Sequence, residues 1–333
     1  MSDIEKLKKK DFVSDQDIRW CPGCGDYAIL SQVQKVFPTL GVPKHKFLVV
    51  SGIGCSSRFP YYMDCYGFHS IHGRAPAVAT GAKLANPDLS VWVITGDGDG
   101  FSIGGNHMMH ALRRNVDLQI LLFNNEIYGL TKGQYSPTSQ VGTQSPSSPT
   151  GSIDTPLSPC LVAMGSGGSF IARSIDTEAK HLAGVVKRGN SHEGAAFIEI
   201  LQNCPIYNDG IFEKVKDKKV APDFKVELVH GEPIRFGKDK EKGISLNRGS
   251  LELEIIGALG NEDKLLIHDE KNKIQAQLLA AMEGPDFPVA VGILYQQEKP
   301  AFISDAQSRL RKARNKDSSI EALLNSGATW EVK

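Results

Sequence analysis

Two apolar runs that flank a glycine-rich acidic turn constrain the fold of this chain more than any other feature. The first run, residues 89–94, leads into the turn GDGDG at residues 96–100. The second run, residues 118–123, ends in two asparagines at residues 124–125. A helix-like segment joins the runs, which predicts two neighbouring parallel strands with their carboxyl ends at one edge of a sheet. Open α/β sheets bind ligands at that edge.

The acidic turn predicts a diphosphate that is held through a metal ion. Glycine amides cradle phosphate oxygens, but the carboxylate of Asp97 would repel a bare diphosphate. Magnesium resolves the conflict, because Mg²⁺ takes carboxylate, amide and phosphate oxygens together. Asp97 and Asn125 lie 28 residues apart, at the ends of the two expected strands. The spacing is similar to the thiamine diphosphate signature, in which GDG is followed further on by NN, and a nucleotide-binding turn without thiamine is the alternative.

Charge and hydropathy exclude several classes of partner. The 333 residues contain 38 Lys and Arg against 38 Asp and Glu, so no net charge attracts nucleic acid or an anionic membrane. No apolar run reaches the ~20 residues that span a bilayer, and the N-terminus lacks the apolar core of a secretory signal. Six cysteines in a chain of this length favour metal or redox use over a disulfide scaffold. We expect a cytoplasmic protein with no nucleic-acid or membrane partner.

Helix and strand patterns alternate over the first two thirds of the chain. Helices are expected at residues 27–37, 75–84, 106–113 and 178–187, and strands at 46–50, 89–94, 118–123, 170–175 and 196–201. Several strands are nearly continuous apolar runs, as in parallel sheets that helices cover on both faces. The pattern predicts an α/β fold with a doubly wound, mostly parallel sheet. We expect this sheet in a domain of residues 16–210, after an N-terminal arm of residues 1–15.

Residues 211–333 are expected to form a C-terminal extension that makes subunit contacts. This region is more polar and carries a possible hairpin at 224–236, a helix at 274–282 and a charged helix with a tail at 305–333. Residues 136–159, rich in Ser, Thr, Pro and Gly, are too long for an ordinary connection. We expect this loop to be functional or partly mobile.

The cysteines indicate a second prosthetic group. Cys21 and Cys24 form a CxxC element, which alone is ambiguous among zinc, a redox dithiol and iron–sulfur ligation. No strand precedes the element, as a thioredoxin motif requires, and no second close pair completes a zinc site. Cys55 and Cys204 follow expected strands at the same edge as Asp97, and Cys204 precedes a proline. Four thiolates that converge there would form a [4Fe–4S] site.

Five motifs follow one another in an order that is highly specific. They are WCPGCG (20–25), SGIGCSSR (51–58), IHGR (71–74), the GDGD…NN element (96–125) and QNCP (202–205). Together they resemble the β subunit of 2-oxoacid:ferredoxin oxidoreductases, of the 2-oxoglutarate type, over about residues 15–215. The resemblance implies the diphosphate-binding half of a thiamine diphosphate fold. It also implies coenzyme A-dependent oxidative decarboxylation of a 2-oxoacid, possible in reverse, with electrons passed to ferredoxin.

The resemblance also implies roles for individual residues. One [4Fe–4S] cluster would be ligated by Cys21, Cys24, Cys55 and Cys204, and Mg²⁺ by Asp97, Asn125 and the carbonyl of Ile127. Thiamine diphosphate would be contacted by Ile53, Gly54, Cys55, Ser56, His72, Gly98, Asp99, Gly129 and Leu130. Cys65 and Cys160 receive no role and are expected to be inert thiols.

Two further residues are candidates for the catalytic site. His72 is expected to contact the diphosphate or the reacting groups, and a surface histidine is the alternative. Lys132, in the sequence GLTKGQ, is close enough to Asn125 to reach the substrate pocket. Members of the resembled family that accept 2-oxoglutarate use a lysine near this position for the distal carboxylate, whereas a solvated loop lysine is the alternative. Arg58 suits either a carboxylate contact or an interface ion pair.

The sequence contains no second α/β unit for the pyrimidine ring of thiamine diphosphate. We therefore expect activity only with an α subunit that supplies this domain, in an α2β2 assembly with the cofactor at the subunit interface. Two alternatives remain open. One is a cluster-free thiamine-dependent decarboxylase or an acetolactate-synthase-like half enzyme. The other is an electron-transfer or iron–sulfur carrier protein whose acidic turn is only a loop.

Overall fold

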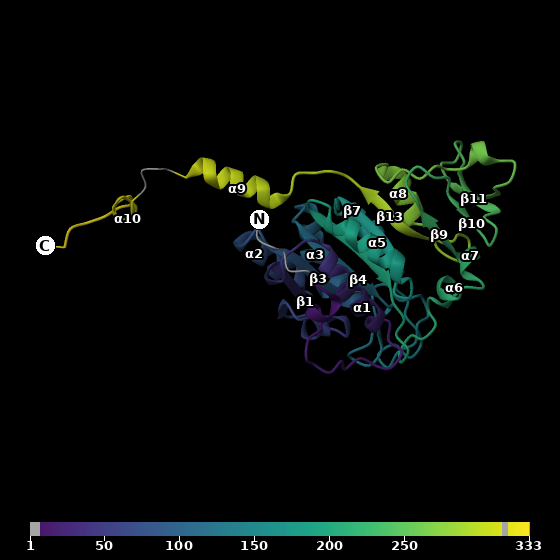
Figure 1. Ribbon diagram of the computed structural model, residues 1–333, viewed down its shortest axis with the longest axis horizontal. Helices are drawn as coiled ribbons and strands as arrows, with labels where there is room; N and C mark the ends of the chain where they lie inside the picture. Colours follow the sequence, from purple (N-terminus) through teal and green to yellow (C-terminus); the bar gives the residue numbers. More distant parts are fainter. Residues whose placement is uncertain (1–6, 315–318, 333) are drawn as a thin grey trace.

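The computed structural model describes residues 7–314 and 319–332, and an eight-stranded sheet lies at its centre (Figure 1). The strand order is β2-β1-β3-β4-β8-β7-β13-β9. Every neighbouring pair is parallel except β13 and β7. A three-stranded antiparallel sheet, β10-β11-β12, and a short two-stranded ribbon, β5-β6, lie outside it. The predicted α/β fold with a mostly parallel sheet is confirmed.

The strands are β1 (Phe47–Ser51), β2 (Tyr66–His69), β3 (Ser90–Gly96), β4 (Leu118–Asn124), β5 (Ile127–Tyr128), β6 (Gln134–Tyr135), β7 (Phe170–Ile175), β8 (Ala195–Leu201), β9 (Lys225–Leu228), β10 (Arg235–Phe236), β11 (Lys242–Leu246), β12 (Leu253–Gly257) and β13 (Val289–Gln296). The α-helices are α1 (Asp26–Val36), α2 (Ala75–Ala85), α3 (Gly105–Arg113), α4 (Pro159–Gly165), α5 (Ala179–Asn190), α6 (Glu213–Lys216), α7 (Ala221–Phe224), α8 (Lys273–Ala280), α9 (Phe302–Ala313) and α10 (Ile320–Leu324). A π-helical turn, η5 (Asp99–Ile103), lies within the acidic motif.

Helices cover both faces of the large sheet, as the apolar strands predict. The core on one face contains side chains of α1 and α5, and these two helices pack together. The core on the other face contains side chains of α2, α3, α4 and α8. All residues of β4 and β8 are buried, because these strands lie in the middle of the sheet. Burial on both faces explains why their sequences are nearly continuous apolar runs.

The predicted N-terminal arm packs in part on the domain. Phe12 is fully buried and makes edge-to-face contacts with Phe37 and Phe47, with ring centroids 5.5 and 5.4 Å apart. Contacts of this kind add about 0.5–1.5 kcal/mol to the burial of the rings. The arm's first six residues lie outside the described part of the chain.

The region beyond residue 210 completes the large sheet. Strands β9 and β13 come from this region and pair in parallel, and β13 joins the domain through β7. The predicted hairpin at 224–236 is wrong, because β9 pairs with β13 whereas β10 pairs with β11 in the smaller sheet. Val226 and Leu228 of β9 and Phe236 of β10 are buried in the same core, so the two strands differ in their pairing partners and not in the core that they join.

The C-terminal segment leaves the body of the molecule after β13 and carries α9 (Figure 1). The helix predicted at 274–282 is confirmed as α8, and the charged C-terminal region contains α9 and α10. Residues 315–318 and 333 of this region lie outside the described chain. No helix in residues 7–314 or 319–332 is long and apolar enough to cross a membrane.

A buried ion pair ties the middle of the sheet to the edge where ligands bind. The guanidinium of Arg173 on β7 donates through Nε to Glu199 on β8 at 2.7 Å, and both side chains are buried. The other oxygen of Glu199 accepts a hydrogen bond from the amide of Asn124 at 2.8 Å. Arg173 also donates to the carbonyl of Ala290 on β13. The pair therefore fixes the last residue of β4, directly before Asn125.

Removal of one partner of this pair is expected to destabilise the fold strongly. Glu199→Leu leaves the charge of Arg173 buried without a partner, at a cost of about 3–5 kcal/mol in the free energy of unfolding. Urea unfolding measures this loss, and Asp88→Ala, which removes the exposed pair of Asp88 with Lys46, serves as the control at less than about 1 kcal/mol. Equal losses for the two variants would contradict the role of burial.

Candidate functional site

Four strand ends meet at one edge of the sheet and form the candidate site. Strands β1, β3, β4 and β8 are consecutive neighbours and run parallel, so the residues that follow them lie together. These residues belong to the loops that carry Cys55, Asp97, Asn125 and Cys204. The arrangement is the strand-end crevice in which α/β proteins bind ligands.

One pocket at this edge contains every residue that the sequence predicted for thiamine diphosphate and magnesium. Its lining comprises the predicted Ile53, Gly54, Cys55, Ser56, His72, Asp97, Gly98, Asp99, Asn125, Ile127, Gly129 and Leu130, together with Gly96, Phe123, Tyr128 and Thr131. We call it the edge pocket. Sequence reasoning missed the last four residues, although three of them adjoin a residue of the predicted set and Phe123 lies two residues before Asn125.

Asp99 organises the wall of the edge pocket. Its Oδ1 accepts hydrogen bonds from the backbone amides of Ile53 and Gly73, at 3.0 and 2.7 Å, and from Nδ1 of His72 at 2.6 Å. Its Oδ2 accepts from the hydroxyl of Thr95 at 2.6 Å. The buried carboxylate thus joins the loops that follow β1 and β2 to strand β3. Asp99 lines the pocket as predicted, but both of its oxygens bind protein donors.

His72 is oriented by this carboxylate. Because Nδ1 faces the carboxylate of Asp99, it carries the proton and donates, which leaves Nε2 for a ligand in the edge pocket. The ring also lies edge-on to the ring of Tyr128, with centroids 6.1 Å apart. His72 is thus held by two neighbours and lines the edge pocket, and its side chain is 34% exposed.

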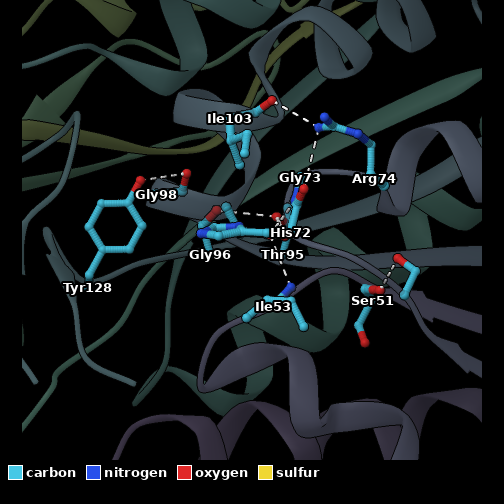
Figure 2. Close-up of polar contacts among 12 residues, drawn as sticks. Ser51, Ile53, His72, Gly73, Arg74, Thr95, Gly96, Gly98, Ile103 and Tyr128 are labelled. Carbon is cyan, nitrogen blue, oxygen red and sulfur yellow. Dashed lines mark hydrogen bonds and ion pairs between the residues drawn. The ribbon is translucent and has the colours of Figure 1, made fainter. Parts of the chain in front are cut away.

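Tyr128 closes one side of the acidic turn. Its hydroxyl donates to the carbonyl of Gly98 at 3.0 Å, as Figure 2 shows. A Cβ atom at Gly98 would lie 2.3 Å from the Tyr128 ring, so only glycine fits beneath the ring. Glycine at this position therefore serves close packing and leaves the backbone of the turn free to approach a ligand.

Hydroxyl groups of the long loop hold Asp97. The side chain of Asp97 is buried, and its Oδ2 accepts hydrogen bonds from Ser136 at 2.5 Å and Thr138 at 2.6 Å. Burial raises the pKa of the Asp97 carboxyl, and the two hydroxyls counteract part of that rise. Nearby, Oδ1 of Asn125 accepts from the backbone amide of Ile127 at 3.2 Å. The first residues of the loop at 136–159 thus orient a predicted metal ligand.

Two of the predicted cluster ligands, Cys55 and Cys204, lie at the edge pocket. A Cβ atom at Gly129 would lie 3.5 Å from the sulfur of Cys55 and 3.6 Å from that of Cys204, so these two thiols face the same short stretch of pocket wall. Burial raises the pKa of the Cys55 thiol to about 12 and that of Cys24 further, with the Asp26 carboxylate adding to the rise at Cys24. Desolvation thus disfavours both thiolates unless a cation is near.

The other cysteines and the metal donors differ in their surroundings. Cys21 is exposed, and the backbone amide of Cys24 donates to its carbonyl. Cys160 lies apart from this group, where its thiol donates to Glu199, and Cys65 is half-buried elsewhere. In the described part of the chain, no three His, Cys, Asp or Glu side chains are placed to hold one metal ion. The predicted magnesium ligands contain only one such side chain, that of Asp97.

Lys132 lies outside the lining of the edge pocket. It is exposed, its backbone φ is 75°, and it follows the lining residue Thr131. A cleft next to the edge pocket is lined in part by Arg58. The cleft and the edge pocket share Ile53, Gly54 and Leu130. The basic residues nearest to these in sequence are Lys132 and Arg58.

Comparisons with known proteins agree with this architecture. Residues 52–200 match the family "Thiamine pyrophosphate enzyme, C-terminal TPP binding domain". The chain is 47% identical over 332 residues to the 2-oxoglutarate oxidoreductase subunit KorB of Mycobacterium tuberculosis, covering 98% of this chain and 88% of that protein. It is 45% identical over 203 residues to the β subunit of the 2-oxoacid:ferredoxin oxidoreductase of Saccharolobus solfataricus, and the match covers 60% of this chain and 67% of that protein.

A solved structure is similar over nearly the whole chain. The 2-oxoglutarate:ferredoxin oxidoreductase of Magnetococcus marinus, with 2-oxoglutarate, coenzyme A and succinyl-CoA bound, matches with a TM-score of 0.78 and 34% identity. The match covers 98% of this chain and 98% of that chain. The likeness therefore includes the C-terminal third, for which the sequence offered no motif.

Substitution of Asp99 tests the organisation of the edge pocket. Asp99→Ala leaves buried donors without an acceptor, each costing about 1–3 kcal/mol, and frees the His72 ring. We expect at least a tenfold loss of thiamine diphosphate affinity in the assembled enzyme, measured by calorimetry. Asp99→Asn keeps one oxygen for the same donors and is expected to retain more affinity. Equal affinities for the wild type and Asp99→Ala would contradict this role.

Proposed function

Because the chain belongs to the family of 2-oxoacid:ferredoxin oxidoreductase β subunits, we propose that it forms the cofactor-binding half of a 2-oxoglutarate:ferredoxin oxidoreductase. With an α subunit it would catalyse coenzyme A-dependent oxidative decarboxylation of 2-oxoglutarate to succinyl-CoA, reversibly, and pass electrons to ferredoxin. When bound, thiamine diphosphate supplies the electron sink for decarboxylation, and a [4Fe–4S] cluster supplies one-electron transfer.

One observation carries the proposal: the edge pocket and two predicted cluster ligands share a wall. Gly129 and Cys55 both line the pocket, and a Cβ atom at Gly129 would lie 3.5 Å from the sulfur of Cys55 and 3.6 Å from that of Cys204. A decarboxylase without a cluster has no use for thiols at this place, and an iron–sulfur carrier has no use for the pocket. The shared wall gives electrons a short route from the pocket to the cysteines, which supports the oxidoreductase over both alternatives.

The residues present fit the groups that the family implies. Asp97, Asn125 and the Ile127 carbonyl offer the oxygen ligands that Mg²⁺ prefers, and two hydroxyls hold the Asp97 carboxylate in place. Cys21, Cys24, Cys55 and Cys204 would ligate the cluster. A four-iron cluster binds each thiolate at a different iron, so its ligands surround a volume and need not meet at a point, as those of a single ion do.

The other residues of the edge pocket bind, orient and exclude water. The backbone of Gly98 lines the pocket and would approach a diphosphate, whereas the amide of Ile53 donates to Asp99, which holds this part of the wall in place. His72 presents Nε2 to the bound groups. Leu130 and Phe123 give the pocket apolar walls, which strengthen every polar contact inside it by lowering the local dielectric.

The pyrimidine side of the cofactor belongs to the proposed α subunit. Within the described residues the chain forms one large α/β sheet and two small sheets, with no second large unit beside the edge pocket. We therefore assign the pyrimidine-binding domain to the partner, in an α2β2 assembly. Ferredoxin, coenzyme A and the 2-oxoacid complete the set of proposed partners.

Anaerobic purification of the chain by itself tests the cofactors and the need for a partner. We expect a brown protein with about four iron and four sulfide per chain and no turnover of 2-oxoglutarate until the α subunit is added. Cys204→Ser is expected to lose most of the iron, whereas Cys65→Ser, a matched change outside the proposed ligand set, retains it. A colourless preparation that holds thiamine diphosphate would favour the decarboxylase, and iron without thiamine in the assembled complex would favour the carrier.

Lys132 is the proposed contact for the distal carboxylate of the substrate. A lysine acts there as a point charge, so Lys132→Ala is expected to raise KM for 2-oxoglutarate by about tenfold, or 1.4 kcal/mol. KM for pyruvate, which lacks that carboxylate, is expected to change little. Steady-state kinetics of the assembled enzyme with both substrates measure the difference. An equal effect on the two substrates would exclude the carboxylate contact.

A further inference from the structure

Gln202 occupies a position between the sheet and the cysteine loops. It follows the last residue of β8 and is fully buried. Its backbone amide donates to the carbonyl of Asn124 at 2.8 Å, which continues the β4–β8 ladder by one residue. The sheet therefore fixes the base of this side chain, two residues before Cys204.

The side-chain amide of Gln202 points at a predicted cluster ligand. Its Nε2 donates to the sulfur of Cys24 at 3.2 Å and to the carbonyl of Asn203 at 2.6 Å. Both neighbours are acceptors, so the two N–H groups of the amide must face them, and this sets its orientation. Among the described residues, no other side chain donates to any of the four predicted ligand sulfurs.

The surroundings make this hydrogen bond consequential. Cys24 is partly buried, and the Gln202 side chain that donates to its sulfur is fully buried. In a buried site a single N–H donor acts through a low dielectric and has a larger effect than at the surface.

We propose that Gln202 sets the reduction potential of the iron–sulfur cluster through its hydrogen bond to the sulfur of Cys24. This inference rests on the proposed function. Reduction adds one electron to the cluster and makes the ligand sulfurs more negative, so the N–H donor stabilises the reduced form more than the oxidised form. The cluster receives the electron as the substrate is oxidised and passes it to ferredoxin. No bond is made or broken at Gln202. Gln202 is therefore a positioning and tuning residue.

A redox titration of the assembled enzyme, followed by electron paramagnetic resonance, tests the proposal. Gln202→Met keeps the length of the side chain and removes the donor, and its cluster is expected to have a more negative midpoint potential than the wild type. Gln202→Glu adds a carboxylate at the same place and is expected to shift the potential in the same direction. The control is Asn203→Ala, because the Asn203 side chain binds Asp209 and no sulfur; its potential is expected to match the wild type.

A second readout follows the hydrogen bond itself. In deuterated water the reduced wild-type cluster is expected to show an exchangeable deuteron coupling that Gln202→Met lacks. An unchanged potential in Gln202→Met and Gln202→Glu with full iron content would overturn the role of Gln202. So would an equal shift in Asn203→Ala, which would indicate displacement of the loop. If the wild type binds no cluster, the proposed function itself fails, and iron analysis distinguishes that outcome.

Discussion

The hydrogen bonds that Asp99 accepts are the constraint on which the candidate site depends. Three loops reach the edge pocket from different strands, and each alone would have a mobile backbone. One buried carboxylate joins them through the amides of Ile53 and Gly73, the ring of His72 and the hydroxyl of Thr95. A buried carboxylate is stable only when donors surround it. The donors on the loops stabilise the buried carboxylate, and the carboxylate in turn holds the loops in place.

The parallel sheet explains why two kinds of prosthetic group would lie next to each other. Parallel strands place all their carboxyl ends at one edge, so residues far apart in the chain meet there. The loops after β3 and β4 line the pocket, while Cys55 and Cys204 follow β1 and β8. Cys55 also lines the pocket, and a Cβ atom at Gly129 would lie 3.5 Å from its sulfur and 3.6 Å from that of Cys204. In the proposed enzyme, this geometry places the site of decarboxylation next to the site of electron transfer.

Buried strands could be predicted because a strand that is buried on both faces consists mostly of apolar residues. Residues 118–123 are apolar except for Gln119, and residues 170–175 are apolar except for Arg173 and Ser174; each range corresponds closely to a strand of the structure. Strand β2 (Tyr66–His69) escaped prediction because it is an exposed edge strand without an apolar pattern. The pairing of β9 was mistaken for a hairpin, because proximity in sequence is a weak guide to the partner of a short strand: β9 pairs with β13, which lies about sixty residues further along the chain.

The predicted pocket residues could be found because the acidic turn, the asparagine pair and the cysteine motifs resemble those of a known family, and the resemblance implies the roles of the residues within them. Their chemistry is carried by residue type, so it can be read before any fold is known. Ser136 and Thr138, which hold Asp97, carry no such signal: they lie in a loop whose composition indicates only that it is irregular. The roles of Tyr128 and Gln202 could likewise not be predicted, since tyrosine and glutamine are common at many kinds of position.

The sequence by itself determined the fold class, the pocket residues and the family resemblance, because apolar periodicity and motif spacing are local properties of the chain. Only the tertiary structure decided which groups orient the predicted site residues. The donor to Cys24 comes from residue 202, and the hydroxyls on Asp97 come from about forty residues downstream. These contacts depend on the pairing of β4 with β8 and on the path of a long loop. Long-range pairing follows from the packing of the whole core and leaves no pattern in any short segment of sequence.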